Sequence, residues 1–303
     1  MNSLNSNSNS INFKYLYSIN AHNNWVTSVS LFPSGNIISV SNDRSIKIYN
    51  TNFDVLQTII DAHDGPITYV DIKDENQFVT CSDDKNIKLW IKNQNEYISY
   101  KTIFNAHLGL IYKVIYYQEK IFSCSLDNTI KIWEEINENI QNITTLTNFN
   151  RVLSILYLDD KKIFVSSGLD GTRFWSLNNY ELIIYIKDAY CGCWNALSRV
   201  DENKIIIGGD NEGTMKIISI SEKKVIKEIH NLFPCWGIKL IENTRFFLVG
   251  GMSKNIKIYK NDNYECIQII NNAHEDFIKG FVKIREGIIA SFSQDGNINL
   301  WSI

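Results

Sequence analysis

The chain has 303 residues, a formal net charge of −3 and a pI near 6.0, so no bulk positive charge draws it to nucleic acid or to anionic lipid. Hydrophobic residues make up 44% and charged residues 21%, as in ordinary globular proteins, and no window approaches the roughly 18 continuous apolar residues of a membrane-spanning helix. The composition therefore predicts a soluble intracellular protein, cytoplasmic or elsewhere inside the cell, with no membrane attachment.

The first twelve residues, MNSLNSNSNSIN, predict a disordered Asn/Ser-rich tail over 1–12, because they contain little that could be buried to offset chain entropy. They have no basic segment followed by an apolar one, so they lack the pattern of a signal peptide. The next seven residues, FKYLYSI (13–19), have the composition of a β-strand. This strand belongs to no complete repeat before it.

From residue 41 onward one phrase recurs along the chain. It appears as SNDRSIKIY (41–49), SDDKNIKLW (82–90), SLDNTIKIW (125–133) and SQDGNINLW (293–301). The Asp of this phrase, replaced in the fifth and sixth copies, marks positions 41 to 43 residues apart, namely Asp43, Asp84, Asp127, Asp170, Glu212, Ser253 and Asp295. Seven units of near-constant length indicate a repeat architecture.

Each unit contains short β-type runs separated by turn residues. The second unit shows four of them, ITYVDI, QFVTCS, NIKLW and YISYKTI, with Gly, Asn and Asp in the breaks as tight hairpins require. No window has a sustained 3.6-residue apolar period, so helices should be few. Seven units of four antiparallel strands predict an all-β fold, a single seven-bladed β-propeller over residues 13–303.

The units resemble the repeats of the WD40 family, and the likeness covers residues 13–303. Four units open with Ala-His, at Ala21-His22, Ala62-His63, Ala106-His107 and Ala273-His274. A Ser or Thr lies four residues before the marker, at Ser39, Thr80, Ser123, Ser166 and Ser291, and units close on an aromatic ring at Tyr49, Trp90, Trp133 and Trp301. The resemblance also implies ring closure: two residues follow Trp301, so the strand at 13–19 is expected to complete blade 7.

In WD40 proteins these four residue types form a buried hydrogen-bond chain inside each blade, called a staple below. The indole N–H donates to the hydroxyl, the hydroxyl to His, and His to the turn Asp, which also accepts backbone N–H groups. The resemblance implies staples in blades 2, 3 and 7, formed by His63, Thr80, Asp84 and Trp90, by His107, Ser123, Asp127 and Trp133, and by His274, Ser291, Asp295 and Trp301. A hydrolytic triad of His63, Asp84 and Thr80 is disfavoured, because the set recurs and a nucleophile does not need repeating.

Blades 4 to 6 depart from the pattern. Blade 4 keeps Ser166 and Asp170 but has no His in the opening slot, and Trp175 falls one place before the usual closing ring. Gly208 and Val249 replace the hydroxyl residues in blades 5 and 6. Two explanations stay open: sequence drift in blades held by apolar packing alone, or release of these blades to present a binding surface.

CGCW (191–194) is the one cysteine cluster, and with Cys235 and His230 it could supply four zinc ligands. CxC is not the usual CxxC clip, so we expect ordinary buried cysteines and no metal, cofactor or disulfide framework. The Gly-rich segment IIIGGDNEG (205–213) matches no phosphate-binding motif and is expected to form a hairpin turn.

The resemblance further implies a partner-binding top face around the central channel, built from residues that flank the first apolar position of each inner strand or precede the turn Asp. We expect partner contacts from Trp25, Leu110, Tyr112, Leu126, Leu153, Leu169, Trp236, Met252 and Phe277. The other positions of this face are Thr27, Asn42, Pro66, Thr68, Asp83, Arg151, Cys193, Asn195, Asn211, Pro234, Lys279 and Gln294. Large aromatics with few charges are typical of interface hot spots.

These observations predict a non-catalytic scaffold for protein–protein interaction, monomeric alone or a subunit of a larger complex, which presents this face to a protein or peptide. One alternative is a substrate receptor or adaptor of a ubiquitin ligase, although no W-D-x-R box follows the closing rings. A second is a hydrolase on a propeller scaffold, for which no non-repeating polar constellation is visible. A third, an RNA-associated scaffold, would need a basic stripe, and the face offers only Arg151 and Lys279.

Overall fold

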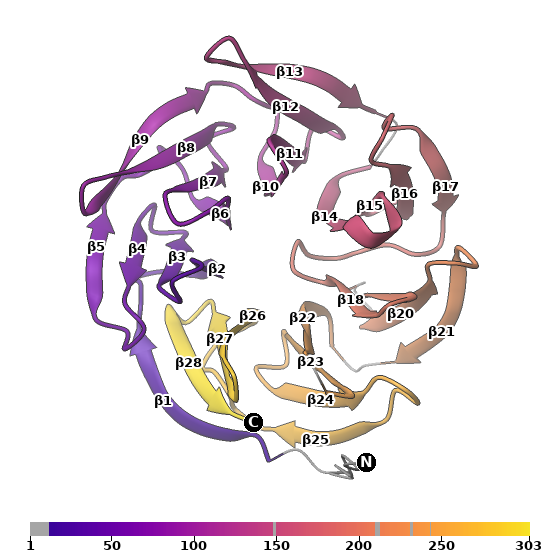
Figure 1. Cartoon of the computed structure of the whole chain (residues 1–303). Helices are drawn as coiled ribbons and strands as arrows, with labels where there is room; N and C mark the ends of the chain where they lie inside the picture. Colours follow the sequence, from indigo (N-terminus) through magenta and orange to yellow (C-terminus); the bar gives the residue numbers. More distant parts are fainter. Residues whose placement is uncertain (1–11, 148–149, 210–212, 231–232, 243) are drawn as a thin grey trace, which may run out of the picture.

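Seven four-stranded antiparallel sheets are arranged around a central axis as the blades of a closed ring (Figure 1). The structure is a computed structural model and describes residues 12–147, 150–209, 213–230, 233–242 and 244–303. Within these ranges the single helix is a 3₁₀ turn, η1, at Asp159–Lys161. The predicted all-β, seven-bladed β-propeller is therefore confirmed.

Each blade runs outward from the channel, with the strands of six blades in chain order. Blade 1 contains β2 (Val26–Leu31), β3 (Ile37–Ser41), β4 (Ile46–Tyr49) and β5 (Val55–Ile59), and blade 2 contains β6 (Ile67–Ile72), β7 (Gln77–Ser82), β8 (Ile87–Asn93) and β9 (Glu96–Ile103). Blade 3 contains β10 (Ile111–Tyr117), β11 (Lys120–Ser125), β12 (Ile130–Ile136) and β13 (Asn139–Leu146), and blade 4 contains β14 (Val152–Leu158), β15 (Ile163–Gly168), β16 (Thr172–Ser176) and β17 (Leu182–Ile186). Blade 5 contains β18 (Leu197–Asp201), β19 (Lys204–Ile207), β20 (Thr214–Ser219) and β21 (Lys224–His230), and blade 6 contains β22 (Cys235–Ile241), β23 (Phe246–Gly251), β24 (Ile256–Lys260) and β25 (Cys266–Ile270). Blade 7 contains β26 (Ile278–Arg285), β27 (Ile288–Ser293), β28 (Asn297–Ser302) and, as its outer strand, β1 (Lys14–Asn20).

The recurrent Asp closes the tight turn between the second and third strands of a blade. In blade 2 the carboxylate of Asp84 accepts a hydrogen bond from the backbone N–H of Asn86 at 2.9 Å, and Lys85 between them has a φ of +71°. A side chain that bonds the backbone two residues ahead stabilises a turn. The same bond recurs in blades 1, 3 and 7, at Asp43, Asp127 and Asp295. The marker residue therefore fixes where each hairpin turns.

The hydrophobic core lies between neighbouring sheets. Ile48 of blade 1 and both Phe78 and Trp90 of blade 2 belong to one buried cluster, and similar clusters join the other blades. Because each sheet has a blade on either side, β3 and β23 are buried along their whole length, whereas the outer strand β5 is largely exposed. Burial on both faces accounts for the apolar character of the inner strands.

Strand β1 closes the ring. It pairs antiparallel with β28 and becomes the fourth strand of blade 7, beside the C-terminal end of the described chain (Figure 1). Phe13 stacks on Trp301 with ring centroids 5.5 Å apart, and the backbone N–H of His22 donates to the carbonyl of Gly296 at 3.0 Å. The expected closure by the N-terminal strand is confirmed.

Residues 1–11, nearly all of the tail that the sequence predicts to be disordered, lie outside the described residues. No helix in the described ranges is long and apolar enough to cross a membrane.

Removal of residues 1–20 should lower the melting temperature, because it leaves the outer edge of β28 unpaired and uncovers Trp301. Phe13→Ala alone should cost about 3–5 kcal/mol of unfolding free energy, as expected for loss of a buried aromatic side chain. Removal of residues 1–10 should leave the melting temperature nearly unchanged. Thermal unfolding of the three variants beside the wild type tests the closure, and equal melting points for the two truncations would contradict it.

Candidate functional site at the mouth of the channel

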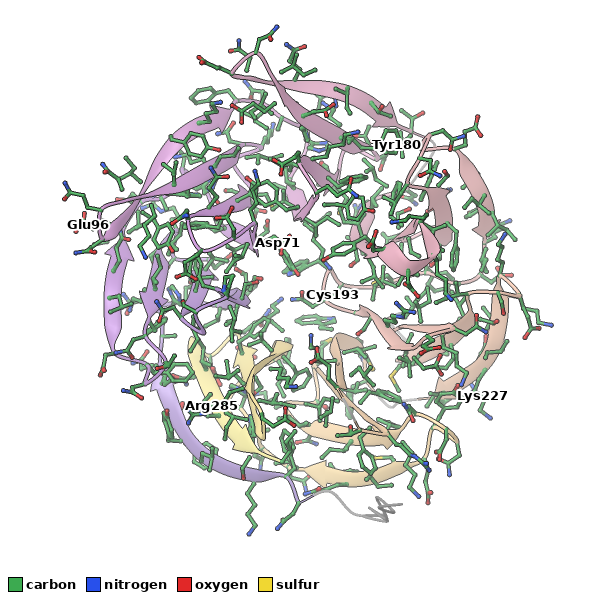
Figure 2. All side chains as sticks on the ribbon, viewed as in Figure 1. Asp71, Glu96, Tyr180, Cys193, Lys227 and Arg285 are labelled. Carbon is green, nitrogen blue, oxygen red and sulfur yellow. The ribbon has the colours of Figure 1, made fainter. Side chains whose placement is uncertain are left out.

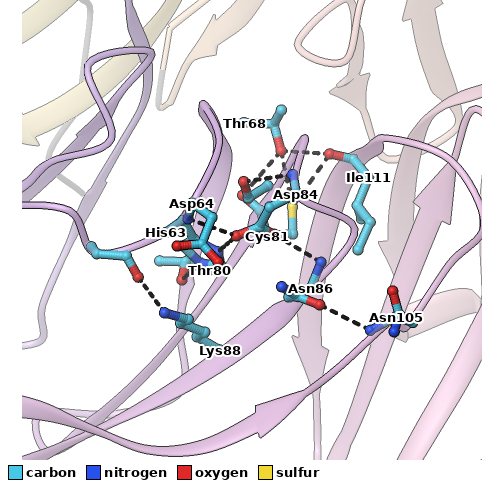
Figure 3. A network of polar contacts seen from close by, with 12 residues as sticks. His63, Asp64, Thr68, Thr80, Cys81, Asp84, Asn86, Lys88, Asn105 and Ile111 are labelled. Atoms are coloured by element: carbon cyan, nitrogen blue, oxygen red, sulfur yellow. Dashed lines mark hydrogen bonds and ion pairs between the residues drawn. The ribbon is translucent and has the colours of Figure 1, made fainter.

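The staple of blade 2 is a continuous chain of hydrogen bonds, and Figure 3 shows its members His63, Thr80 and Asp84. Trp90 Nε1 donates to the hydroxyl of Thr80 at 2.9 Å, and this hydroxyl lies 2.8 Å from Nε2 of His63. Nδ1 of His63 lies 2.8 Å from the carboxylate of Asp84. Because a carboxylate only accepts, Nδ1 carries the proton and Nε2 accepts from Thr80. The four residues therefore lie as the family resemblance implies.

Blades 3 and 7 contain the same chain. His107 lies 2.7 Å from Ser123 and 2.9 Å from Asp127, and His274 lies 2.7 Å from Ser291 and 2.8 Å from Asp295. The closing indoles complete both chains, through Trp133 to Ser123 and Trp301 to Ser291. All twelve expected staple residues of blades 2, 3 and 7 are thus brought together.

The staples of blades 1 and 4 are incomplete in different ways. In blade 1 the hydroxyl of Tyr49 is buried without a hydrogen-bond partner among the described residues, so the closing ring only packs. In blade 4 Trp175 still donates to Ser166 at 2.8 Å, despite its shifted position in the sequence. Arg173 takes the place of the missing His and pairs with Asp170 at 2.6 Å.

The staples cannot act as catalytic triads. Thr80 and His63 are completely buried, so no substrate could reach the hydroxyl. Burial lowers the pKa of His63 against the opposing effect of Asp84, which keeps the imidazole neutral. Burial alone would raise the pKa of Asp84, but hydrogen bonds from His63 and from backbone N–H groups bring it below its usual value. These features suit a structural role.

The second residue of each inner strand points to the mouth of the channel. In six blades the strand pairing shifts at this residue, which forms a β-bulge. Bulges re-aim side chains where a strand ends. With their counterpart in blade 5 these residues form the mouth ring, which consists of Thr27, Thr68, Tyr112, Leu153, Asn195, Trp236 and Lys279.

Trp194, directly before Asn195, also reaches the mouth, and the sequence analysis missed it. The positions predicted at the top of blade 5 were Cys193 and Asn195, on either side of Trp194. The pairing of Ile205 with Ile218 corresponds to that of Phe78 with Trp90 in blade 2, and the pairing of Leu197 with Ile207 to that of Val70 with Thr80. Asn195 therefore takes the position of Thr68, as predicted, and Trp194 takes the position of Ile67. Cys193 is buried instead. Residues at this position in other blades, such as Ile67 and Ile111, are buried, so the repeat pattern gave no signal that Trp194 would reach the mouth.

The segment around Trp194 enters the centre of the ring, where Figure 2 labels Cys193. The indole of Trp194 stacks on Tyr112 of blade 3 with centroids 5.9 Å apart, and its carbonyl accepts from Ser154 of blade 4 at 2.7 Å. The side-chain amide of Asn195 donates to the carbonyl of Lys279 at 3.0 Å. Contacts from one loop therefore reach blades 3, 4 and 7 across the channel.

An aromatic cluster surrounds Lys279 at the same level. Its Nζ lies 4.2 Å from the ring centroid of Trp236 and 4.9 Å from those of Trp25 and Trp194. Trp236 also meets Phe277 edge-on, with centroids 5.3 Å apart. Burial lowers the pKa of Lys279. The mouth thus combines large aromatic rings with one buried cation.

The nine expected partner contacts differ in accessibility. Trp25, Leu169 and Met252 are exposed, and Leu110, Tyr112, Leu126, Trp236 and Phe277 are half-buried. Leu153 is only 6% exposed, so it packs beneath the face and offers a partner almost no surface. Asn211, a further expected position, lies outside the described residues.

Leu108 is an exposed apolar residue that the sequence analysis did not include. It is 84% exposed on the top face, directly after His107, and its N–H donates to the turn Asp127 at 2.9 Å. Blades 1, 2 and 7 have the polar residues Asn23, Asp64 and Glu275 at this place. That substitution of an apolar for a polar residue is the signal that could have found it.

The cysteine cluster offers no reactive thiol. Cys191, Cys193 and Cys235 are buried, and burial raises the pKa of Cys191 to about 12. His230, the fourth ligand considered for zinc, is exposed at the end of β21. In the part of the chain that the structure describes, no group of three or more His, Cys, Asp and Glu side chains could hold a metal ion.

Three stretches of the chain match a known repeat family. Residues 13–50, 54–90 and 99–134 each match the family model described as WD domain, G-beta repeat. These stretches cover the first three repeats, where the staple residues of the sequence are well preserved. A comparison with curated proteins found no match.

Acidification should destabilise the protein in two ranges of pH. Burial lowers the pKa of His22, His63 and His107 below 6.5, and the staple hydrogen bonds, against the effect of burial, lower the pKa of Asp84 and Asp295 below 3.8. In both ranges the unfolded chain binds more protons than the folded one. The contribution of these groups to the stability of the fold is therefore complete above pH 6.5. It falls as the pH is lowered, first when the His residues and then when the Asp residues are protonated. Melting temperature measured against pH tests this.

His107→Gln provides the matched variant. It should cost about 1–3 kcal/mol near neutral pH by leaving staple partners unpaired, and it should flatten the loss of stability between about pH 7 and pH 5. His230→Gln changes an exposed histidine outside the staples. It should neither lower the stability near neutral pH nor flatten its dependence on pH. An unaltered pH slope in His107→Gln would contradict the role of the staples.

Proposed function

The chain belongs to the WD40-repeat family, and from this membership and its surface we propose that it is a rigid, non-catalytic scaffold that binds a protein or peptide through its top face. WD40 propellers are generally protein-interaction scaffolds. The observation that carries the proposal is the exposed apolar surface that surrounds the mouth of the channel.

This surface has two parts. Over blades 3 and 4 it contains Leu108, Leu126 and Leu169, of which the first and last are exposed. Over blades 6, 7 and 1 it contains Met252 and Trp25 beside the aromatic cluster. Exposed apolar residues gathered on one face of a soluble protein mark interaction sites, and aromatic anchors contribute most of the binding energy in such sites.

The frame beneath this surface supports a scaffold role. The loops of the top face begin and end at staple turns, and Leu126 N–H donates to the carbonyl of Leu110 at 2.9 Å, which holds two of the surface residues together. Arg151 N–H likewise donates to the side chain of Asn128 at 2.8 Å and joins blade 4 to blade 3. Residues held in place before binding lose little conformational entropy when a partner docks.

The absence of catalysis is part of the proposal. The repeated polar groups are buried in staples, the cysteine thiols of the mouth are buried, and the cation of Lys279 is enclosed by rings. None of these provides a nucleophile and a base in contact with an accessible surface.

The double variant Leu108→Asp, Leu169→Asp tests the top face. Both side chains are exposed and pack little, so the fold should tolerate the change, whereas Tyr112 and Trp236 pack against other rings and would report on stability as well. Partners captured from the source cells by the wild type should bind the double variant about tenfold or more weakly.

Leu182→Asp, an exposed leucine on the outer strand β17, is the matched control and should retain every partner. All three proteins must first show the same melting curve. Retention of the partners by the double variant would overturn the proposal, and loss by the control instead would place the binding surface on the circumference.

A further inference from the structure

A lysine ammonium lies among three tryptophan rings, each from a different blade. Lys279 of β26 is only 3% exposed, and Trp25, Trp194 and Trp236 enclose its Nζ at distances of 4.2 to 4.9 Å from the ring centroids. Among the described residues this Nζ forms neither a hydrogen bond nor an ion pair. A charged group buried in this way needs an explanation.

The rings compensate only part of the cost of burial. An ammonium has three N–H donors, and ring faces attract its charge without replacing the hydrogen bonds that it makes in water. Burial lowers the pKa of Lys279, which agrees with a charge that remains under-compensated. The group would therefore gain from a carboxylate that reached it.

The neighbouring ionisable groups do not supply that partner. Asp276 and Cys193 are the groups whose charges favour the ammonium. The carboxylate of Asp276 accepts the N–H of Phe277 at 2.8 Å and forms no ion pair with Lys279 in the described structure. Burial raises the pKa of Cys193, so its thiol is neutral. Among the described residues, no anion of this chain pairs with the ammonium.

We propose that Lys279 anchors a carboxylate of the partner, an Asp or Glu side chain flanked by apolar residues that lie on the aromatic cluster. This inference rests on the proposed function and adds the chemistry of the partner. A charge-assisted hydrogen bond from the ammonium satisfies both groups in a water-poor site, and it rejects partners that bring a cation or an apolar group to the same place.

Trp25 provides access to the ammonium. It is the most exposed of the three rings, at 38%, and within the described chain its indole stacks on no other aromatic ring. In the proposed complex a change of its side-chain rotamer would uncover Nζ from the top face, while Trp194 and Trp236 stay packed on Tyr112 and Phe277.

Selection from a random heptapeptide library displayed on phage tests the inference. Binders of the wild type should contain Asp or Glu beside apolar residues. Lys279→Met keeps the length and the packing of the side chain but removes the charge, so the acidic preference should disappear. Peptides selected on the wild type should bind this variant about tenfold or more weakly.

Lys113→Met is the matched control, since Lys113 is also buried, at 7% exposure, with its Nζ 5.0 Å from the ring centroid of Tyr69. It should retain the acidic preference. Apolar binders that depend on Leu108 and Leu169 but lack acidic residues, or an acidic preference that survives Lys279→Met, would overturn this inference alone. Binders indifferent to the two leucines, or a library without binders, would contradict the proposed function as well.

Discussion

Closure of the ring by β1 is the constraint on which the site depends. The pairing of β1 with β28 places blade 1 against blade 7, so Trp25, near the start of the chain, lies over Lys279, near its end. Trp194 and Trp236 reach the same point from blades 5 and 6. No single blade contains even two of these four residues. The geometry of the mouth is therefore a property of the complete ring, and its stability follows the stability of closure.

Blades 5 and 6 replace staples with close backbone packing. A Cβ on Gly237 would lie 2.6 Å from Cα of Gly280, and a Cβ on Gly192 would lie 1.3 Å from the carbonyl oxygen of Gly209. Only glycine allows the backbones to approach so closely. This approach lets the loop that contains Asn195 enter the channel and donate to β26. Loss of staple residues and gain of glycines thus coincide in the blades that shape the mouth, which favours a functional origin of their departure over drift.

The fold could be predicted from the sequence because its signals repeat. Asp84 and its counterparts mark five of the seven units at a nearly constant spacing, so an error in one unit is corrected by the others. The site has no such redundancy. Trp194 was missed because it holds a repeat position that is buried and apolar in blade 2, that of Ile67, whereas here its indole contacts Tyr112 and Lys279. Leu153 was wrongly counted as surface because its burial depends on neighbouring blades, and Leu108 was missed because it lies in a loop outside the repeated pattern.

The loop at Trp194 changes what the propeller can present to a partner. An open channel would offer a rim of separate loops, each free to adjust. Here the indole of Trp194 contacts Tyr112 on one side and Lys279 on the other, so the rims of blades 3 and 7 are joined across the axis. A partner that bound this face would meet a continuous aromatic platform with a cation beneath it. Apolar contact on such a platform supplies affinity with little selectivity, whereas a buried charge penalises every ligand that leaves it unpaired. Specificity in this protein is therefore expected to come from the centre of the face and affinity from its leucine-rich side.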